Sequence, residues 1–144
     1  MDKTMDLRAR TEIADVVHKY ALAVRRGEPA DCSELFTEDA SFEVRYADPL
    51  KPGTVTTAHR SEGRANVIAT ITRSVTQVCM FPMIHNLLIE VDGDTAIASS
   101  LMIGRMWPQG KEIMGEYADC FRRESGQWRF VSRIFTNCGA ELTP

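Results

Sequence analysis

The sequence predicts an α+β fold: a cone-shaped α+β barrel in which three helices of the N-terminal half pack on a curved, mostly antiparallel sheet. Apolar residues recur at helical spacing in the N-terminal half. The pair Asp92-Gly93 separates two β-rich runs, which is one of the strongest hairpin signals in a short sequence. Four consecutive β-rich runs joined by short turns follow residue 82. Helices grouped early and strands grouped late are typical of this class. A sheet that curls over an amphipathic helix leaves a conical hollow, which ligand sites favour.

Three segments are predicted to be helical. Residues 6–26 form a long amphipathic helix that ends at Gly27 and Pro29. Its apolar stripe consists of Ile13, Val16, Val17, Tyr20, Ala21 and Val24. A short helix follows Pro29, and a third begins after Gly63 and buries Val67, Ile68, Ile71 and Val75.

Six segments are predicted to be strands. Residues 41–46 alternate between apolar and polar side chains, and the β-branched run 54–57 pairs back on them after a loop with two prolines. The hairpin at Asp92-Gly93 starts near Pro82 and continues to Trp107. Residues 112–123 and 127–136 complete the sheet.

Strict alternation along the first strand of this hairpin places His85 on an apolar face. Met83, His85, Leu87, Ile89 and Val91 would share one side, and Ile84, Asn86, Leu88 and Glu90 the other. His85 is then either a core histidine with one hydrogen bond or a proton-transfer group in an apolar pocket. Tyr20 has the same two interpretations, as a core aromatic or as a hydroxyl donor aimed into a cavity.

Length, charge and cysteine spacing exclude several classes of protein. A chain of 144 residues with 44% hydrophobic content suits a single domain over 1–144. The net charge of −3 argues against a nucleic-acid partner. No apolar run approaches the ~20 residues that span a bilayer, and no signal peptide is evident, so a cytoplasmic protein without membrane contact is expected. The four cysteines lack ligand spacing, which predicts reduced buried thiols, no metal site and no cofactor.

Residues 16–28, 35–40, 91–96, 115–123, 126–130 and Arg133 together form a pattern shared with a known superfamily. They resemble the nuclear-transport-factor-2-like superfamily, which includes the SnoaL-like polyketide cyclases, the scytalone-dehydratase group and the ketosteroid isomerases. The resemblance implies the fold predicted above and a small-molecule site inside it. It covers nearly the whole chain and does not define the reaction, because one fold hosts many chemistries.

The resemblance also implies roles for individual residues. Tyr20 stands where several members place a tyrosine that hydrogen-bonds the substrate oxygen, and Asp119 where the isomerases complete their oxyanion hole. His85 is similar in placement to the histidine of the dehydratase-like members. In contrast, two positions differ from the family. Val44 stands where the isomerases have their general base, and Arg25 stands where the dehydratases have an acidic partner.

The candidate site therefore combines Tyr20 as hydrogen-bond donor, His85 as base or acid, and Asp119 as orienting carboxylate or neutral donor. Arg133 would hold an anionic group, and Trp107, Phe42 and Met83 would contact the substrate. If Asp119 and Arg133 face inward on adjacent strands, an ion pair at ~4 Å is worth about 4 kcal/mol at an effective dielectric near 20. The pair is then either part of the site or a structural element.

The first functional hypothesis is a cofactor-independent lyase or isomerase that dehydrates or isomerises a small apolar hydroxy or keto compound, such as a polyketide, aromatic, terpenoid or steroid. The alternative is a non-catalytic domain of the same fold that binds a small ligand or dimerises through the outer sheet face, where Ile84, Leu88, Met102 and Met106 are expected to lie. Epoxide hydrolysis is a third hypothesis, because Asp119 and Arg133 supply part of the arrangement that it needs in this superfamily. Apolar strand faces indicate a homo-oligomer, either a dimer or a trimer.

Overall fold

The computed structural model describes residues 2–75 and 79–138, and it confirms the α+β fold. The helices are α1 (Lys3–Arg26), the 3-10 helix η1 (Pro29–Leu35) and α2 (Arg64–Val75). The strands are β1 (Phe36–Ala47), β2 (Val55–Glu62), β3 (Cys79–Asp92), β4 (Thr95–Trp107), β5 (Glu112–Glu124) and β6 (Gln127–Asn137).

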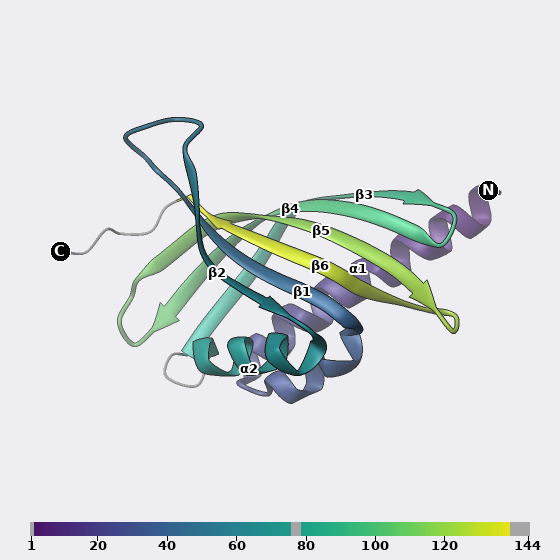
Figure 1. Cartoon of the computed structure of the whole chain (residues 1–144), viewed down its shortest axis with the longest axis horizontal. Coiled ribbons are helices and arrows are strands. Elements are labelled where there is room, and N and C mark those ends of the chain that lie inside the picture. The colour runs from purple at the N-terminus through teal and green to yellow at the C-terminus, as the bar shows by residue number, and fades with distance from the viewer. Residues whose placement is uncertain (1, 76–78, 139–144) are drawn as a thin grey trace.

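The six strands form one curved sheet in the order β2-β1-β6-β5-β4-β3. All neighbouring strands are antiparallel except β1 and β6, which are parallel. The sheet does not close, because its end strands β2 and β3 are not paired with each other in the described part of the chain. Figure 1 shows α1 running along one face of the sheet, with α2 near the C-terminal end of α1. The sheet and these helices enclose the core.

Local signals explain both ends of α1. The Asp2 side chain accepts a hydrogen bond from the Thr4 backbone N–H at 2.7 Å, which caps the N-terminus. At the other end Gly27 adopts φ of +67°, a left-handed conformation that glycine reaches without strain. The predicted apolar stripe faces the sheet, and Ile13 and Val17 are completely buried.

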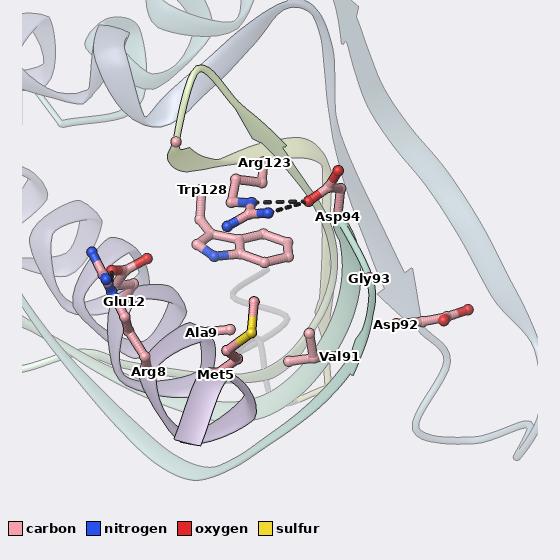
Figure 2. A pocket seen from close by; sticks show the side chains of 11 residues that line it. Met5, Arg8, Ala9, Glu12, Val91, Asp92, Gly93, Asp94, Arg123 and Trp128 are labelled. Atoms are coloured by element: carbon pink, nitrogen blue, oxygen red, sulfur yellow. Dashed lines mark hydrogen bonds and ion pairs between the residues drawn. The ribbon is translucent and has the colours of Figure 1, made fainter. Parts of the chain in front are cut away.

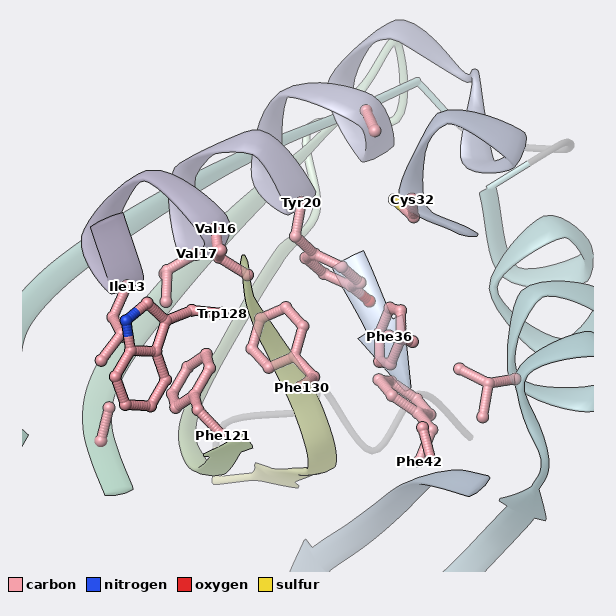
Figure 3. Packing of buried hydrophobic residues seen from close by; sticks show 14 of the residues in the cluster. Ile13, Val16, Val17, Tyr20, Cys32, Phe36, Phe42, Phe121, Trp128 and Phe130 are labelled. Atoms are coloured by element: carbon pink, nitrogen blue, oxygen red, sulfur yellow. The ribbon is translucent and has the colours of Figure 1, made fainter. Parts of the chain in front are cut away.

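Aromatic rings fill the centre of the core under α1. The ring centroid of Phe130 lies 5.0 Å from that of Phe36 and 4.9 Å from that of Phe121. Tyr20 of α1 meets Phe130 and Phe36 edge-on, with centroids 6.0 and 6.1 Å apart. Figure 3 shows these rings in a row beneath α1, with Trp128 at one end and Phe42 at the other. This row attaches the helix to strands β1, β5 and β6.

A β-bulge in β3 breaks the alternation on which the His85 prediction relied. The pairing of β3 with β4 shifts between His85 and Leu88, and Asn86 has φ of +53°. Before the bulge the even-numbered residues face the helices, whereas after it the odd-numbered residues do. The prediction that Met83 and His85 share a face with Leu87 is therefore wrong. Met83 and His85 are exposed on the outer face of the sheet.

The cysteines are free, as the sequence indicates, but most of them are not buried. Cys32 is completely buried, Cys79 is half-buried, and Cys120 and Cys138 are exposed. The prediction of four buried thiols is wrong because Cys120 faces outward on β5 and Cys138 follows the end of β6.

Candidate ligand-binding site

A pocket of about 320 Å³ lies between the concave face of the sheet and the helices α1 and α2. Its aliphatic and thioether side chains include Ala21, Val24, Val44, Ile71, Val75, Met80, Pro82, Ile84, Met102, Met106 and Ile113. Its aromatic and polar side chains are Tyr20, Phe42, Tyr46, Ser74, Tyr117, Phe135 and Asn137. A mostly apolar cavity with a few polar groups is typical of small-molecule sites.

Two buried tyrosines line this pocket. Tyr20 comes from α1 and Tyr117 from β5, their ring centroids are 6.4 Å apart, and each side chain affects the pKa of the other. Burial raises the pKa of Tyr20 well above its ordinary value and also raises the pKa of Tyr117, although the nearby Arg133 cation opposes both shifts. Both hydroxyls are therefore protonated at neutral pH. A protonated hydroxyl can donate a hydrogen bond to a ligand acceptor.

An ion pair lies directly beneath the pocket floor. Tyr117 is paired with Phe135 across β5 and β6, and one inward-facing step further along the same strands Asp119 is paired with Arg133. The Arg133 Nε and Asp119 Oδ1 atoms are 3.1 Å apart, and both side chains are completely buried. The N–H of Nε is not well aligned with the carboxylate, and Nη1 and Nη2 have no hydrogen-bond acceptor among the described residues.

The Arg133 guanidinium compensates for these missing hydrogen bonds with aromatic contacts. Its central carbon lies 3.5 Å from the ring centroid of Tyr117, 4.3 Å from that of Tyr20 and 4.7 Å from that of Phe130. A desolvated cation over an aromatic face is attracted by the ring quadrupole, worth about 2 kcal/mol or more. Tyr20 and Tyr117 thus contact both the pocket and the buried cation.

Burial dominates the ionisation of Asp119. Loss of solvent raises the pKa of this carboxyl group to about 6, and the positive charge of Arg133 reverses only part of that increase. At pH 7 the carboxyl group is still mostly ionised, as the predicted pairing with Arg133 requires. Below pH 6 it becomes neutral.

The structure brings four of the seven predicted site residues together. Tyr20 and Phe42 line the pocket, and Asp119 and Arg133 lie beneath it. The remaining three, His85, Met83 and Trp107, are exposed and do not line it.

The predicted meeting of the His85 ring with Tyr20 is wrong, because the β3 bulge leaves His85 on the outer face. Trp107, at the end of β4, is 66% exposed. Val44 does line the pocket, whereas Arg25 is exposed and stacks on Phe81. The described lining therefore contains no imidazole and no carboxylate.

Sequence reasoning missed Tyr117 and Ile84. Tyr117 is two residues before Asp119 on a strand whose alternation is regular up to that point, so the face predicted for Asp119 already implied an inward Tyr117. Ile84, Met102 and Met106 were expected on the outer face but line the pocket. For Ile84 the cause is the bulge, which inverts the faces of β3 at His85.

A second hollow, of about 680 Å³, lies at the opposite end of α1, between its first turns and the β3–β4 and β5–β6 turns. Figure 2 shows Arg123 ion-paired with Asp94 beside the Trp128 ring, and Met5 reaching toward the indole. None of the predicted site residues lines this hollow.

Two further features bear on the class of site. Within residues 2–75 and 79–138, no three His, Cys, Asp or Glu side chains gather in a way that would hold a metal ion. In the same residues no helix has the length and apolar character needed to cross a bilayer.

Comparison with protein families gives a match over residues 5–134 to the family described as SnoaL-like domain. The chain belongs to the SnoaL-like family. The predicted superfamily is confirmed, and the prediction of one domain over residues 1–144 stays a prediction. No curated protein matches this chain significantly.

Several solved structures of other proteins have the same fold as this SnoaL-like chain. A protein of unknown function from Mycobacterium tuberculosis has 26% identity and a TM-score of 0.76, with 95% of this chain and 76% of that chain covered. The β subunit of a candidate aromatic-ring-hydroxylating dioxygenase from Novosphingobium aromaticivorans has 17% identity and a TM-score of 0.79, with 96% of this chain and 95% of that chain covered. A candidate scytalone dehydratase from the same organism has 21% identity and a TM-score of 0.73, with 94% of this chain and 88% of that chain covered.

Proposed function

We propose that this SnoaL-like protein binds a small, mostly apolar molecule with at least one hydrogen-bond-accepting oxygen, such as an aromatic or polyketide-like ketone or alcohol. The observation that carries the proposal is the pair of buried tyrosines, Tyr20 and Tyr117, in the wall of a mostly apolar pocket. The apolar lining would bury the ligand's rings. A hydroxyl proton of Tyr20 or Tyr117 would be donated to the ligand's oxygen.

The lyase or isomerase reaction predicted from the sequence needs a base, and the predicted base, His85, does not line the pocket. That hypothesis assigned the proton to His85, which is on the other side of the sheet. Both pocket tyrosines have raised pKa values and are poor bases at neutral pH. Binding, which was the alternative hypothesis, is therefore the better supported function.

Binding is tested with two bicyclic probes that differ in one oxygen, 1-tetralone and the hydrocarbon tetralin, by isothermal titration calorimetry. Tyr20→Phe and Tyr117→Phe should each weaken 1-tetralone binding about fivefold to tenfold, because a net hydrogen bond is worth about 1 kcal/mol. Neither variant should change tetralin binding. Tyr46→Phe is the matched control, since Tyr46 lines the same pocket but is 44% exposed. Equal weakening of both probes, or no binding of either, would contradict the proposal.

Catalysis is tested with the same ketone. Proton NMR in D₂O follows exchange of the hydrogens next to the 1-tetralone carbonyl, and we expect the protein not to accelerate it. Acceleration that His85→Ala abolishes would restore the lyase or isomerase hypothesis. His85→Ala should otherwise leave both exchange and 1-tetralone affinity unchanged.

We also propose that the protein forms a homo-oligomer, as the sequence predicts, through the outer face of the sheet. Exposed apolar side chains there include Met83, Leu88, Ile97, Leu101 and Met114. Of the four residues expected on this face from the sequence, only Leu88 is on it. An exposed apolar surface of this kind is typical of protein interfaces.

A further inference from the structure

We infer that the pocket binds anionic aromatic ligands, such as an aromatic carboxylate or sulfonate, more tightly when Asp119 is protonated. The inference rests on the proposed function of the pocket and names its ligand class. It is carried by the layer of charge that β5 and β6 place immediately beneath the pocket floor.

Strand geometry sets how close this charge is to a ligand. Asp119 and Arg133 are each two residues from a lining residue on their own strand, Tyr117 and Phe135 respectively. Two residues along a strand correspond to about 7 Å. Protein atoms, mainly the Tyr117 and Tyr20 rings against the guanidinium, occupy the space between. Solvent and salt screen such a buried charge weakly.

In the described part of the chain, Asp119 is the one ionic partner of the Arg133 cation. Its Nη1 and Nη2 groups have no hydrogen-bond acceptor within residues 2–75 and 79–138, so Asp119 supplies the neutralising charge. While Asp119 is ionised, the pair has no net charge and its field in the pocket is small. Protonation of Asp119 leaves a net positive charge beneath the floor, which attracts an anion.

Among the residues that the structure describes, no other group that faces this pair changes charge between pH 5 and 7.5. Arg133 is surrounded by Tyr117 from β5, Tyr20 from α1 and Cys32 from η1. Burial raises the pKa of each of these three groups, to about 11 for Cys32, so all three stay neutral. On β4, Asp119 is opposite Ala98, which does not titrate. Among the described neighbours, Asp119 alone switches the charge.

The expected effect follows from linkage. A unit charge on the order of 10 Å away in an effective dielectric of about 20 changes a binding constant about tenfold. Because the carboxyl group titrates with a pKa of about 6, most of that change falls between pH 7.5 and pH 5. Reciprocity requires that a bound anion raise the pKa of Asp119 by the same coupling.

The test compares naphthalene-2-sulfonate, which is anionic throughout this range, with naphthalene-2-sulfonamide, which has nearly the same shape and is neutral. Sulfonate affinity should rise about fivefold from pH 7.5 to pH 5, whereas sulfonamide affinity should change less than twofold. Asp119→Asn should remove the pH dependence. Glu116→Gln is the matched control, because Glu116 is an exposed carboxylate on the outer face of the same strand and its removal should preserve the pH dependence.

The outcomes separate the two proposals. If the sulfonamide and 1-tetralone bind but sulfonate affinity is independent of pH, or sulfonate does not bind, the charge inference is overturned and the proposed function survives. If no probe binds, both fail. Should Asp119→Asn not fold, NMR titration of the Asp119 carboxyl carbon in the wild-type protein gives the same answer. Sulfonate must then raise the midpoint, and an unchanged midpoint overturns the inference.

Discussion

Asp119 should make the wild-type protein less stable as the pH rises from 4 to 7. The pKa of this carboxyl group is about 6 in the folded protein, against 3.8 for an ordinary aspartate. Between these two values the folded state binds more protons than the unfolded state, so the free energy of unfolding falls as the pH rises. A difference of about 2 pKa units at 1.36 kcal/mol each corresponds to about 3 kcal/mol.

Asp119→Asn removes this titration and isolates it from the other carboxylates. Glu34 and Asp39 have lowered pKa values, which act in the opposite direction, but both groups are present in wild type and variant and cancel in the difference. We expect the unfolding free energy of the variant minus that of the wild type to increase by about 2.5 kcal/mol from pH 4 to pH 7, which is most of the full difference. Any constant difference between an amide and a protonated carboxyl group does not affect this slope.

Urea unfolding monitored by tryptophan fluorescence measures the difference, because Trp128 is only 5% exposed in the folded protein. A difference that shrinks with rising pH would refute the reasoning. It would mean that attraction to Arg133 outweighs the loss of solvent, as in a well-aligned buried ion pair. A Glu116→Gln variant, altered at an exposed carboxylate, should show no such slope.

Three further predictions concern packing and assembly. Phe130→Ala should lower the free energy of unfolding by about 3–5 kcal/mol in urea, because the ring is completely buried and packs against three others and a guanidinium. Gly115→Ala should lower the free energy of unfolding by about 1–3 kcal/mol, since an added Cβ would collide with the backbone carbonyl of Thr136. Gly104→Ala should lower it less, because the nearest atoms there are the sulfurs of flexible methionine side chains. Leu88→Lys should lower the molar mass measured by light scattering after size-exclusion chromatography toward that of a monomer, because this side chain is 70% exposed on the proposed interface. A variant with the same molar mass as the wild type would contradict an interface at Leu88.

Elements with regular periodicity could be predicted from the sequence. The stripe on α1 identified its buried face, and Asp92-Gly93 identified the β3–β4 hairpin, because both signals depend on neighbouring residues only. Asp119 and Arg133 face each other as expected, since the alternation that places them inward is regular on β5 up to that point. The ionisation of Asp119 could not be predicted, because it depends on how completely the surrounding elements exclude solvent.

The bulge at Asn86 is the reason that the same alternation argument succeeded on β5 and failed on β3. One extra residue inverts every later face of a strand, so the side chains on the two sides of a bulge obey opposite rules. Leu87 and Ile89 of β3 do face the core, as the sequence suggested, and an unbroken strand would then have carried His85 inward with them. Because the bulge comes between His85 and Leu87, it brings Ile84 into the pocket and leaves the imidazole outside. The exclusion of His85 from the pocket and the presence of Ile84 in its lining thus have one backbone cause. The chemistry left to the pocket is that of the tyrosine pair and the buried charges beneath it.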